Sequence, residues 1–253
     1  MDGISQTTKR ACIQGYPVDL IDEKKGIEIV ESFIANSKPA QVVTINPEMI
    51  ELAKKNPEFS NILKEAEIVI PDGVGVVLAL KLMGIKIQRL PGIEFSEGLI
   101  KLASEKGYKV AFLGADAKTI QKAVAELQKK YASLNIVYVH DGFFDKDEEK
   151  LIIEDIKKAD ADLLFIGIGV PRQEIFISNY KNLLVDIIMV GVGGSFDVWS
   201  QNIKRAPLFF RKLGLEWFYR LMKQPSRFSR MFPTLPLFLI KVLVNFRENR
   251  KEY

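Results

Sequence analysis

Asp72 is the residue in this sequence best placed to do chemistry. It directly follows the apolar run Ile68–Pro71, so its carboxylate should emerge at the end of a buried strand, in a partly desolvated crevice. A carboxylate in that position can act as a general base that takes a proton from a substrate hydroxyl. Because Gly73 comes next, the same residues are also an ordinary turn signal, and the pattern alone leaves both interpretations open.

Three glycines, Gly191, Gly193 and Gly194, follow another apolar run and suit a diphosphate. Glycine lets the backbone approach a ligand closely, and the free amides at the start of a following helix attract phosphate. A tight turn that needs a positive φ is the alternative for each glycine. No G-x-G-x-x-G follows the first strand and G-x-x-x-x-G-K-[ST] is absent, which argues against a dinucleotide oxidoreductase and a P-loop hydrolase.

Metal and imidazole chemistry receive little support from the sequence. No group of His, Cys and carboxylate residues has metal-ligand spacing, and a Ser-His or Cys-His pair would have to use His140, which is the only histidine. A packed or solvent-exposed histidine at a strand end is the favoured interpretation of that residue. We therefore expect no metal and no cofactor.

A parallel sheet would present these residues at one edge. Short β-branched runs alternate with helical stretches, which is the pattern of an α/β sheet. The expected strands are Ala40–Ile45, Glu67–Ile70, Lys109–Leu113, Asn135–Val139, Asp162–Ile168 and Asp186–Val192. Helices are expected over Lys118–Tyr131, and over Lys146–Lys158 after an N-cap at Asp145. The predicted fold class is α/β, a doubly wound, mostly parallel Rossmann-like sheet.

Ligands of such sheets bind outside the carboxyl ends of the strands. Four segments that follow predicted strands should therefore face one crevice: residues 44–48, 71–75, 167–174 and 191–197.

Residues 203–253 differ from the rest of the chain in charge. They hold 12 Lys/Arg and 3 Asp/Glu, whereas residues 1–202 hold 24 and 29. We expect two domains, a Rossmann-like body over 1–202 and a basic, aromatic helical appendage over 203–253. The apolar run Leu235–Phe246 is about twelve residues long, and crossing a bilayer takes about twenty. We expect the appendage to lie on an anionic membrane surface and not to bind nucleic acid. Core helices with a solvated basic face, and nucleic-acid binding, stay open as alternatives.

The remaining composition indicates a cytoplasmic protein. Residues 1–10 lack an apolar signal stretch, and a single cysteine, Cys12, fits a reducing compartment. With the basic appendage, this predicts a peripheral protein on the inner face of the cell membrane. The oligomeric state, including a homo-oligomer, is left open.

Together, nine segments resemble the WecG/TagA/CpsF family of glycosyltransferases, also called glycosyltransferase family 26, and the resemblance covers nearly the whole chain. Each segment alone is a short loop, but their order along the chain is specific. They are TINPE at 44–48, PDGVG at 71–75, RLPG at 89–92, FLGA at 112–115, DGFF at 141–144, GVPRQE at 169–174, GVGGSFD at 191–197, KRAP at 204–207 and GLEWFYR at 214–220.

The resemblance implies an inverting, metal-independent transfer from a UDP-sugar to a saccharide on undecaprenyl diphosphate, in surface-polysaccharide synthesis. N-acetylmannosamine joined to lipid-linked N-acetylglucosamine is the best-known product of the family. Glucosyl, glucuronosyl and N-acetylmannosaminuronic acid donors stay open, as does a membrane-bound nucleotide-sugar-binding protein without turnover. This chain departs from the family pattern at Ile45, at Phe143 and at 201–202, which leaves the donor in question.

Site residues follow from the same motif positions. Asp72 would be the base, and Arg89 would neutralise the departing diphosphate. Two further sets are implied. Thr44, Asn46 and Gln173 would hold the sugars, and Gly114, Gly142, Phe143, Gly193, Gly194 and Asp197 would bind the nucleotide, with the Phe143 ring against uracil. Arg220, Arg227 and Arg230 would grip the lipid diphosphate, because without a metal guanidinium groups must supply the positive charge.

Overall fold

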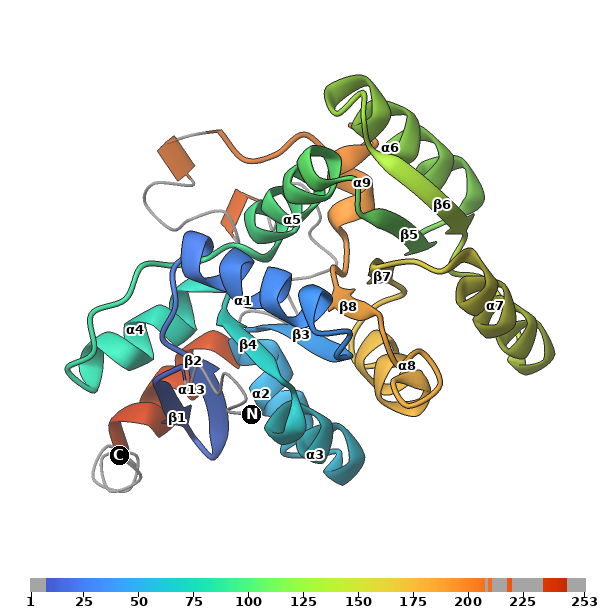
Figure 1. Cartoon of the computed structure of the whole chain (residues 1–253). Coiled ribbons are helices and arrows are strands. Elements are labelled where there is room, and N and C mark those ends of the chain that lie inside the picture. The colour runs from blue at the N-terminus through green and yellow to red at the C-terminus, as the bar shows by residue number, and fades with distance from the viewer. Residues whose placement is uncertain (1–7, 208, 211–217, 220–233, 245–253) are drawn as a thin grey trace.

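The centre of the molecule is a six-stranded parallel sheet (Figure 1). The computed structural model describes residues 8–207, 209–210, 218–219 and 234–244. The strands lie in the order β4-β3-β8-β7-β5-β6. Their bounds are Ala40–Ile45 for β3, Ile68–Pro71 for β4, Lys109–Gly114 for β5, Asn135–His140 for β6, Leu163–Gly167 for β7 and Ile188–Gly191 for β8. All six predicted strands are present within two residues of the expected ends, and the predicted fold class is confirmed.

Helices cover both faces of the sheet, which buries most strand residues on two sides and explains their continuous apolar runs. One face packs against α1 (Glu23–Ala35), α5 (Gly92–Lys106), α6 (Ala117–Lys130) and α9 (Ser195–Trp199). The other face packs against α2 (Pro47–Ala53), α3 (Pro57–Glu65), α4 (Val74–Leu82), α7 (Lys146–Ala159) and α8 (Arg172–Tyr180). The predicted helices are α6 and α7. The Asp145 N-cap is also confirmed, because its carboxylate accepts from Asp147 and Glu148 amides in a capping box.

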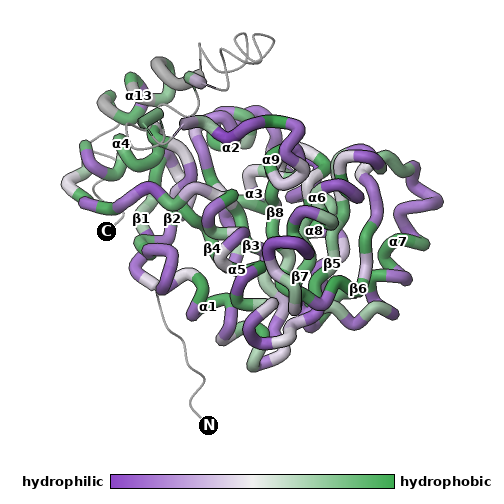
Figure 2. Tube along the Cα trace, turned by 90° about the horizontal axis from the view of Figure 1, so that it is seen from above, coloured by the Kyte–Doolittle hydropathy of each residue, from purple (hydrophilic) through white to green (hydrophobic). Residues whose placement is uncertain are grey.

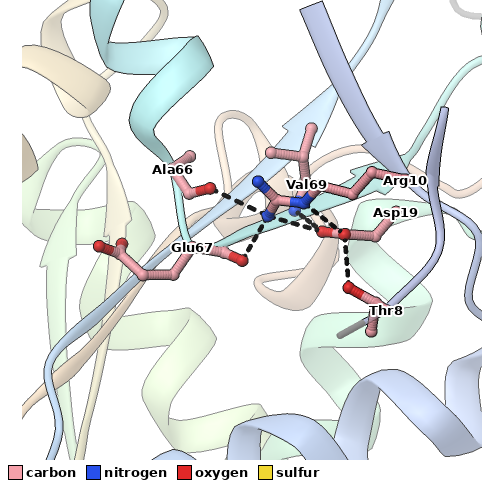
Figure 3. A network of polar contacts seen from close by, with 6 residues as sticks. All are labelled: Thr8, Arg10, Asp19, Ala66, Glu67 and Val69. Carbon is pink, nitrogen blue, oxygen red and sulfur yellow. Dashed lines mark hydrogen bonds and ion pairs between the residues drawn. The ribbon is translucent and has the colours of Figure 1, made fainter. Parts of the chain in front are cut away.

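An N-terminal hairpin, β1 (Arg10–Ile13) and β2 (Tyr16–Asp19), was not expected from the sequence. It is fastened to the edge strand β4 by the buried Asp19 carboxylate (Figure 3). That carboxylate accepts from the Val69 amide at 2.7 Å, from Arg10 Nε at 2.7 Å and from Thr8 Oγ1 at 2.8 Å. The hairpin therefore blocks part of an open sheet edge. It also anchors the strand that carries Asp72 at its far end.

Helix α13 (Thr234–Val244) lies beside α4 at one end of the molecule, in both views (Figures 1 and 2). Phe238 and Val242 are fully buried in the core that α2, α4 and the hairpin share. Lys241 forms an ion pair with Glu51 of α2. Burial acts to raise the pKa of Glu51, but hydrogen bonds from Lys241 and Lys54 outweigh it and leave the pKa lowered. One face of the apolar run expected at the membrane is thus part of the core.

The other face of α13 exposes Leu237, Ile240 and Val244, and the neighbouring α4 exposes Leu78 and Leu82. We call these five side chains the apolar end. None of the described helices combines the length and the apolar character that crossing a bilayer requires.

Candidate active site

The predicted site residues that the structure describes lie along one edge of the sheet, where all six parallel strands end. They form two groups. The base group contains Thr44 near the end of β3, Asn46 and Asp72 directly after β3 and β4, and Arg89 in the segment between α4 and α5. The loop group lies at or after the ends of β5 to β8 and contains Gly114, Gly142, Phe143, Gln173, Gly193, Gly194 and Asp197. Arg220, Arg227 and Arg230 lie outside the described residues, so their predicted role is untested.

Asp72 and Arg89 form the charged centre of the base group. The Arg89 Nη2 lies 3.3 Å from the Asp72 Oδ1, and the two side chains keep 22% and 26% of their surface exposed. The Asp72 amide donates to Ile45 O at 3.0 Å, which extends the β3–β4 pairing by one residue and fixes where the carboxylate begins. A carboxylate held beside a guanidinium and open to solvent can reach a substrate. Its predicted role as a base stays a prediction.

Thr44 and Asn46 lie at the end of β3, against the glycines that follow Asp72 and Arg89. The Asn46 Oδ1 accepts from the Met49 amide at 3.1 Å as the N-cap of α2, which leaves the NH₂ end and one lone pair of the amide oxygen for a ligand. Gly73 has a φ of +93°, and a Cβ there would lie 3.3 Å from the Asn46 Cβ. Gly92 similarly abuts the Thr44 side chain, with 2.8 Å from an added Cβ to Cγ2. These glycines bring the turns around Asp72 close together.

Hydrogen bonds among two buried side chains and a backbone amide hold the loop group. Gln173 and Glu174, in the first turn of α8, are 2% and 1% exposed. The Gly193 amide donates to Gln173 Oε1 at 3.0 Å, and Gln173 Nε2 donates to Glu174 Oε1 at 2.7 Å. Each polar end of the Gln173 amide makes one hydrogen bond within the protein, and its expected role of holding a sugar stays a prediction. Gln173 joins the loop after β7 to the loop after β8.

The glycines of the loop group differ in whether other atoms of the protein fill the space beside their Cα atoms. An added Cβ on Gly114 would lie 2.5 Å from Gly167 O, and one on Gly142 would lie 3.1 Å from the Gly114 Cα. At these two positions the close approach is to neighbouring loops. Gly193 differs, because it has a φ of +50° and nothing within 4 Å of an added Cβ. Gly194 is open apart from the Asp197 Oδ2 at 3.6 Å. Space for a ligand therefore lies at Gly193 and Gly194.

Phe143 stands at the tip of the loop after β6, with 77% of its surface exposed. Arg172, for which no role was expected, holds this loop. It donates to Gly142 O at 3.0 Å and to Phe144 O at 3.3 Å, and its guanidinium stacks 4.5 Å from the centre of the Phe144 ring. The only signal for Arg172 and Glu174 was their place beside Gln173 in the GVPRQE segment. Their partners are distant in sequence, so spacing could not reveal them.

His140 is a packed histidine, as the favoured interpretation of the sequence had it. Its ring stacks on Tyr138 and contacts Phe144 edge-on, and Nδ1 lies 2.9 Å from Asp141 O. Among the residues that the structure describes, no group of His, Cys, Asp and Glu side chains is arranged to hold a metal ion.

Known proteins are similar to this sequence over most of its length. A sequence model of the glycosyl transferase WecG/TagA/CpsF family matches residues 11–252. A Bacillus spizizenii protein is 35% identical over 88% of this chain and 86% of its own, and a Bacillus subtilis protein is 33% identical over 90% and 88%. A Staphylococcus aureus protein is 32% identical over 96% of both chains. All three are named N-acetylglucosaminyldiphosphoundecaprenol N-acetyl-beta-D-mannosaminyltransferase. The chain belongs to the WecG/TagA/CpsF family of glycosyltransferases.

Proposed function

We propose that this enzyme transfers N-acetylmannosamine from a UDP donor to N-acetylglucosamine on undecaprenyl diphosphate, with inversion and without a metal. The named relatives support the acceptor and the transferred sugar. The observation that carries the proposal for this chain is the ion pair between Asp72, directly after β4, and Arg89, just before α5. It supplies a carboxylate base and a fixed positive charge within one group of residues.

The reaction needs a base for the acceptor hydroxyl and a site that binds the departing diphosphate. Asp72 takes the proton from the acceptor hydroxyl as that oxygen attacks the anomeric carbon, and the bond to UDP breaks on the opposite face. Negative charge then grows on the departing diphosphate, where Arg89 and backbone amides stabilise it. The open loop at Gly193 and Gly194 receives the diphosphate, Asp197 contacts the nucleotide, and the exposed Phe143 ring stacks on uracil. Thr44 and the Asn46 NH₂ group hold the sugars.

The proposal includes a membrane contact through the apolar end. Helix α4 begins two residues after Asp72 and lies beside α13 (Figure 2). It exposes Leu78 and Leu82, and α13 adds three more exposed apolar side chains. Lys81 is exposed on the same helix as the two leucines. Apolar side chains with nearby lysine suit the boundary between headgroups and acyl chains of an anionic bilayer. A lipid-linked acceptor would then meet Asp72 at the membrane surface. Salt should weaken this attachment, because surface charges are screened over about 8 Å at physiological ionic strength.

A donor screen tests the proposal. The full chain in detergent is given a polyprenyl-diphosphate-linked N-acetylglucosamine acceptor and, separately, the UDP derivatives of N-acetylmannosamine, glucose, glucuronic acid and N-acetylmannosaminuronic acid. We expect transfer from UDP-N-acetylmannosamine. Transfer from another donor would change the substrate and leave the reaction class intact. UDP binding without transfer from any donor would indicate a binding protein that has lost turnover.

A further inference from the structure

Glu174 is a buried acid to which the proposed reaction gives no part. Its side chain lies against Gly191, the last residue of β8. A Cβ added to Gly191 would lie 2.7 Å from Gln173 Nε2 and 3.2 Å from Glu174 Oε1. Glycine at 191 is therefore what leaves room for the Gln173–Glu174 pair. The Glu174 backbone oxygen accepts from Gln41 Nε2 of β3 at 3.3 Å, which ties the same residue to the neighbouring strand.

The hydrogen bond to Glu174 decides which way the Gln173 amide faces. At a pH above its pKa Glu174 is an ionised carboxylate, whose oxygens only accept, so the amide must present Nε2 to Glu174 and Oε1 to the Gly193 amide. If the amide turned over, its NH₂ group would face the Gly193 N–H, and two donors would oppose each other. We infer that Glu174 is a positioning residue, whose carboxylate fixes the Gln173 amide and through it the Gly193 loop that receives the donor diphosphate.

The burial of Glu174 supports a specific role, because an acid in this position is costly. Its second oxygen, Oε2, is buried and has no hydrogen-bond partner among the residues that the structure describes. Desolvation raises the pKa of Glu174 to about 7, although the hydrogen bond from Gln173 acts to lower it. An apolar side chain would avoid this cost but could not accept from Gln173.

The inference rests on the proposed function, because it takes the Gly193 loop to be the donor site. Calorimetry with UDP at pH 8, on the full chain in detergent, tests it with two variants. Glu174→Leu removes the acceptor, and we expect UDP affinity to fall about tenfold or more. Glu174→Gln keeps an acceptor oxygen, and we expect an affinity within about threefold of the wild type.

An exchange of the two residues keeps the test decisive if Glu174→Leu does not fold. Gln173→Glu alone places two carboxylates side by side and should weaken UDP binding as much as Glu174→Leu does. Combined with Glu174→Gln, it restores both bonds, since residue 173 then accepts from Gly193 and from the new amide at 174. The exchanged protein should bind UDP within about threefold of the wild type.

Asp19→Asn is the matched control, because Asp19 is an equally buried carboxylate in the hairpin network of Figure 3, away from the loop group. It should lower the unfolding temperature and leave UDP affinity unchanged. A folded Glu174→Leu protein with wild-type UDP affinity, or an exchange that rescues nothing, overturns the inference. Gly193→Val separates this failure from a wrong donor site: if that variant also binds UDP normally, the diphosphate lies elsewhere and the proposed site fails as well.

Discussion

The base group and the loop group lie at the same edge of the sheet but differ in how far their polar side chains are buried. The base group has a charged pair, Asp72 and Arg89, each about a quarter exposed. In the loop group the amide of Gln173 and the acid Glu174 are almost fully buried and bond to each other and to the backbone. A group that reacts must reach the substrate, whereas a loop that binds phosphate through its amides must be held still. Damage to the first should therefore slow transfer, and damage to the second should weaken UDP binding.

The largest loss should come from a third set of charges. Replacing Arg220, Arg227 and Arg230 together by Ala should reduce transfer to the limit of detection, because these guanidinium groups are proposed to grip the lipid diphosphate. UDP affinity and attachment to anionic vesicles should largely persist, since the loop group and the apolar end are unchanged. Transfer assays and vesicle sedimentation measure the two effects. Wild-type transfer by the triple variant would remove the arginines from the mechanism.

Glu174, the buried acid beside the Gly193 loop, should make the free energy of unfolding depend on pH. The folded-state pKa of Glu174, about 7, lies above its ordinary value of 4.5, so the folded state keeps a proton that the unfolded chain loses. Its neighbours Gln173, Gln41 and Gly191 carry no charge. The free energy of unfolding should therefore fall as pH rises from 4.5 to about 7, by up to about 3 kcal/mol, and level off above it.

Urea unfolding of the wild type and of Glu174→Gln at pH 5, 6, 7 and 8 measures this contribution. The wild type should lose stability relative to the variant across that range, since the variant has no proton to release at 174. Two curves that stay parallel would mean that Glu174 does not titrate there.

Gly193→Val and Asp197→Ala change two residues of the loop group that are proposed to contact the donor. The first forces a β-branched residue to a φ of +50° and fills the open space, and the second removes a carboxylate beside Gly194. We expect each to weaken UDP binding about tenfold or more in calorimetry. Unchanged affinity in both would place the nucleotide elsewhere.

A smaller effect is expected at the apolar end. Leu78→Gln with Leu82→Gln should weaken partition onto anionic vesicles about tenfold, because two apolar side chains no longer enter the lipid boundary. Leu151→Gln with Leu183→Gln is the matched control, since both leucines are exposed and lie outside α4 and α13. Equal partition of the two double variants would remove α4 from the membrane contact. Point variants serve better than a cut after Asn202, which would expose the core around Phe238 and Val242.

The sequence predicted what depends on local pattern. Buried parallel strands are runs of β-branched residues, and α6 and α7 show helical spacing with caps, so these elements could be read directly. The hairpin was missed because its strands have only 4 residues each, and its turn, Gln14 and Gly15 at positive φ, is not a strong hairpin signal. The strand ends were predicted within two residues, but the partners of Arg172 and Glu174 come from distant segments, and one sequence does not reveal such contacts.

The rate of transfer by Asp72→Asn, measured together with its UDP affinity, tests the division between the two groups most directly. The amide keeps the shape of the carboxylate but cannot take the acceptor proton. We predict that turnover falls by about 10² or more while UDP affinity and unfolding temperature stay at wild-type values. A correctly folded Asp72→Asn protein with near-normal turnover would contradict the assignment of the base, and with it the account of how the two groups share the reaction.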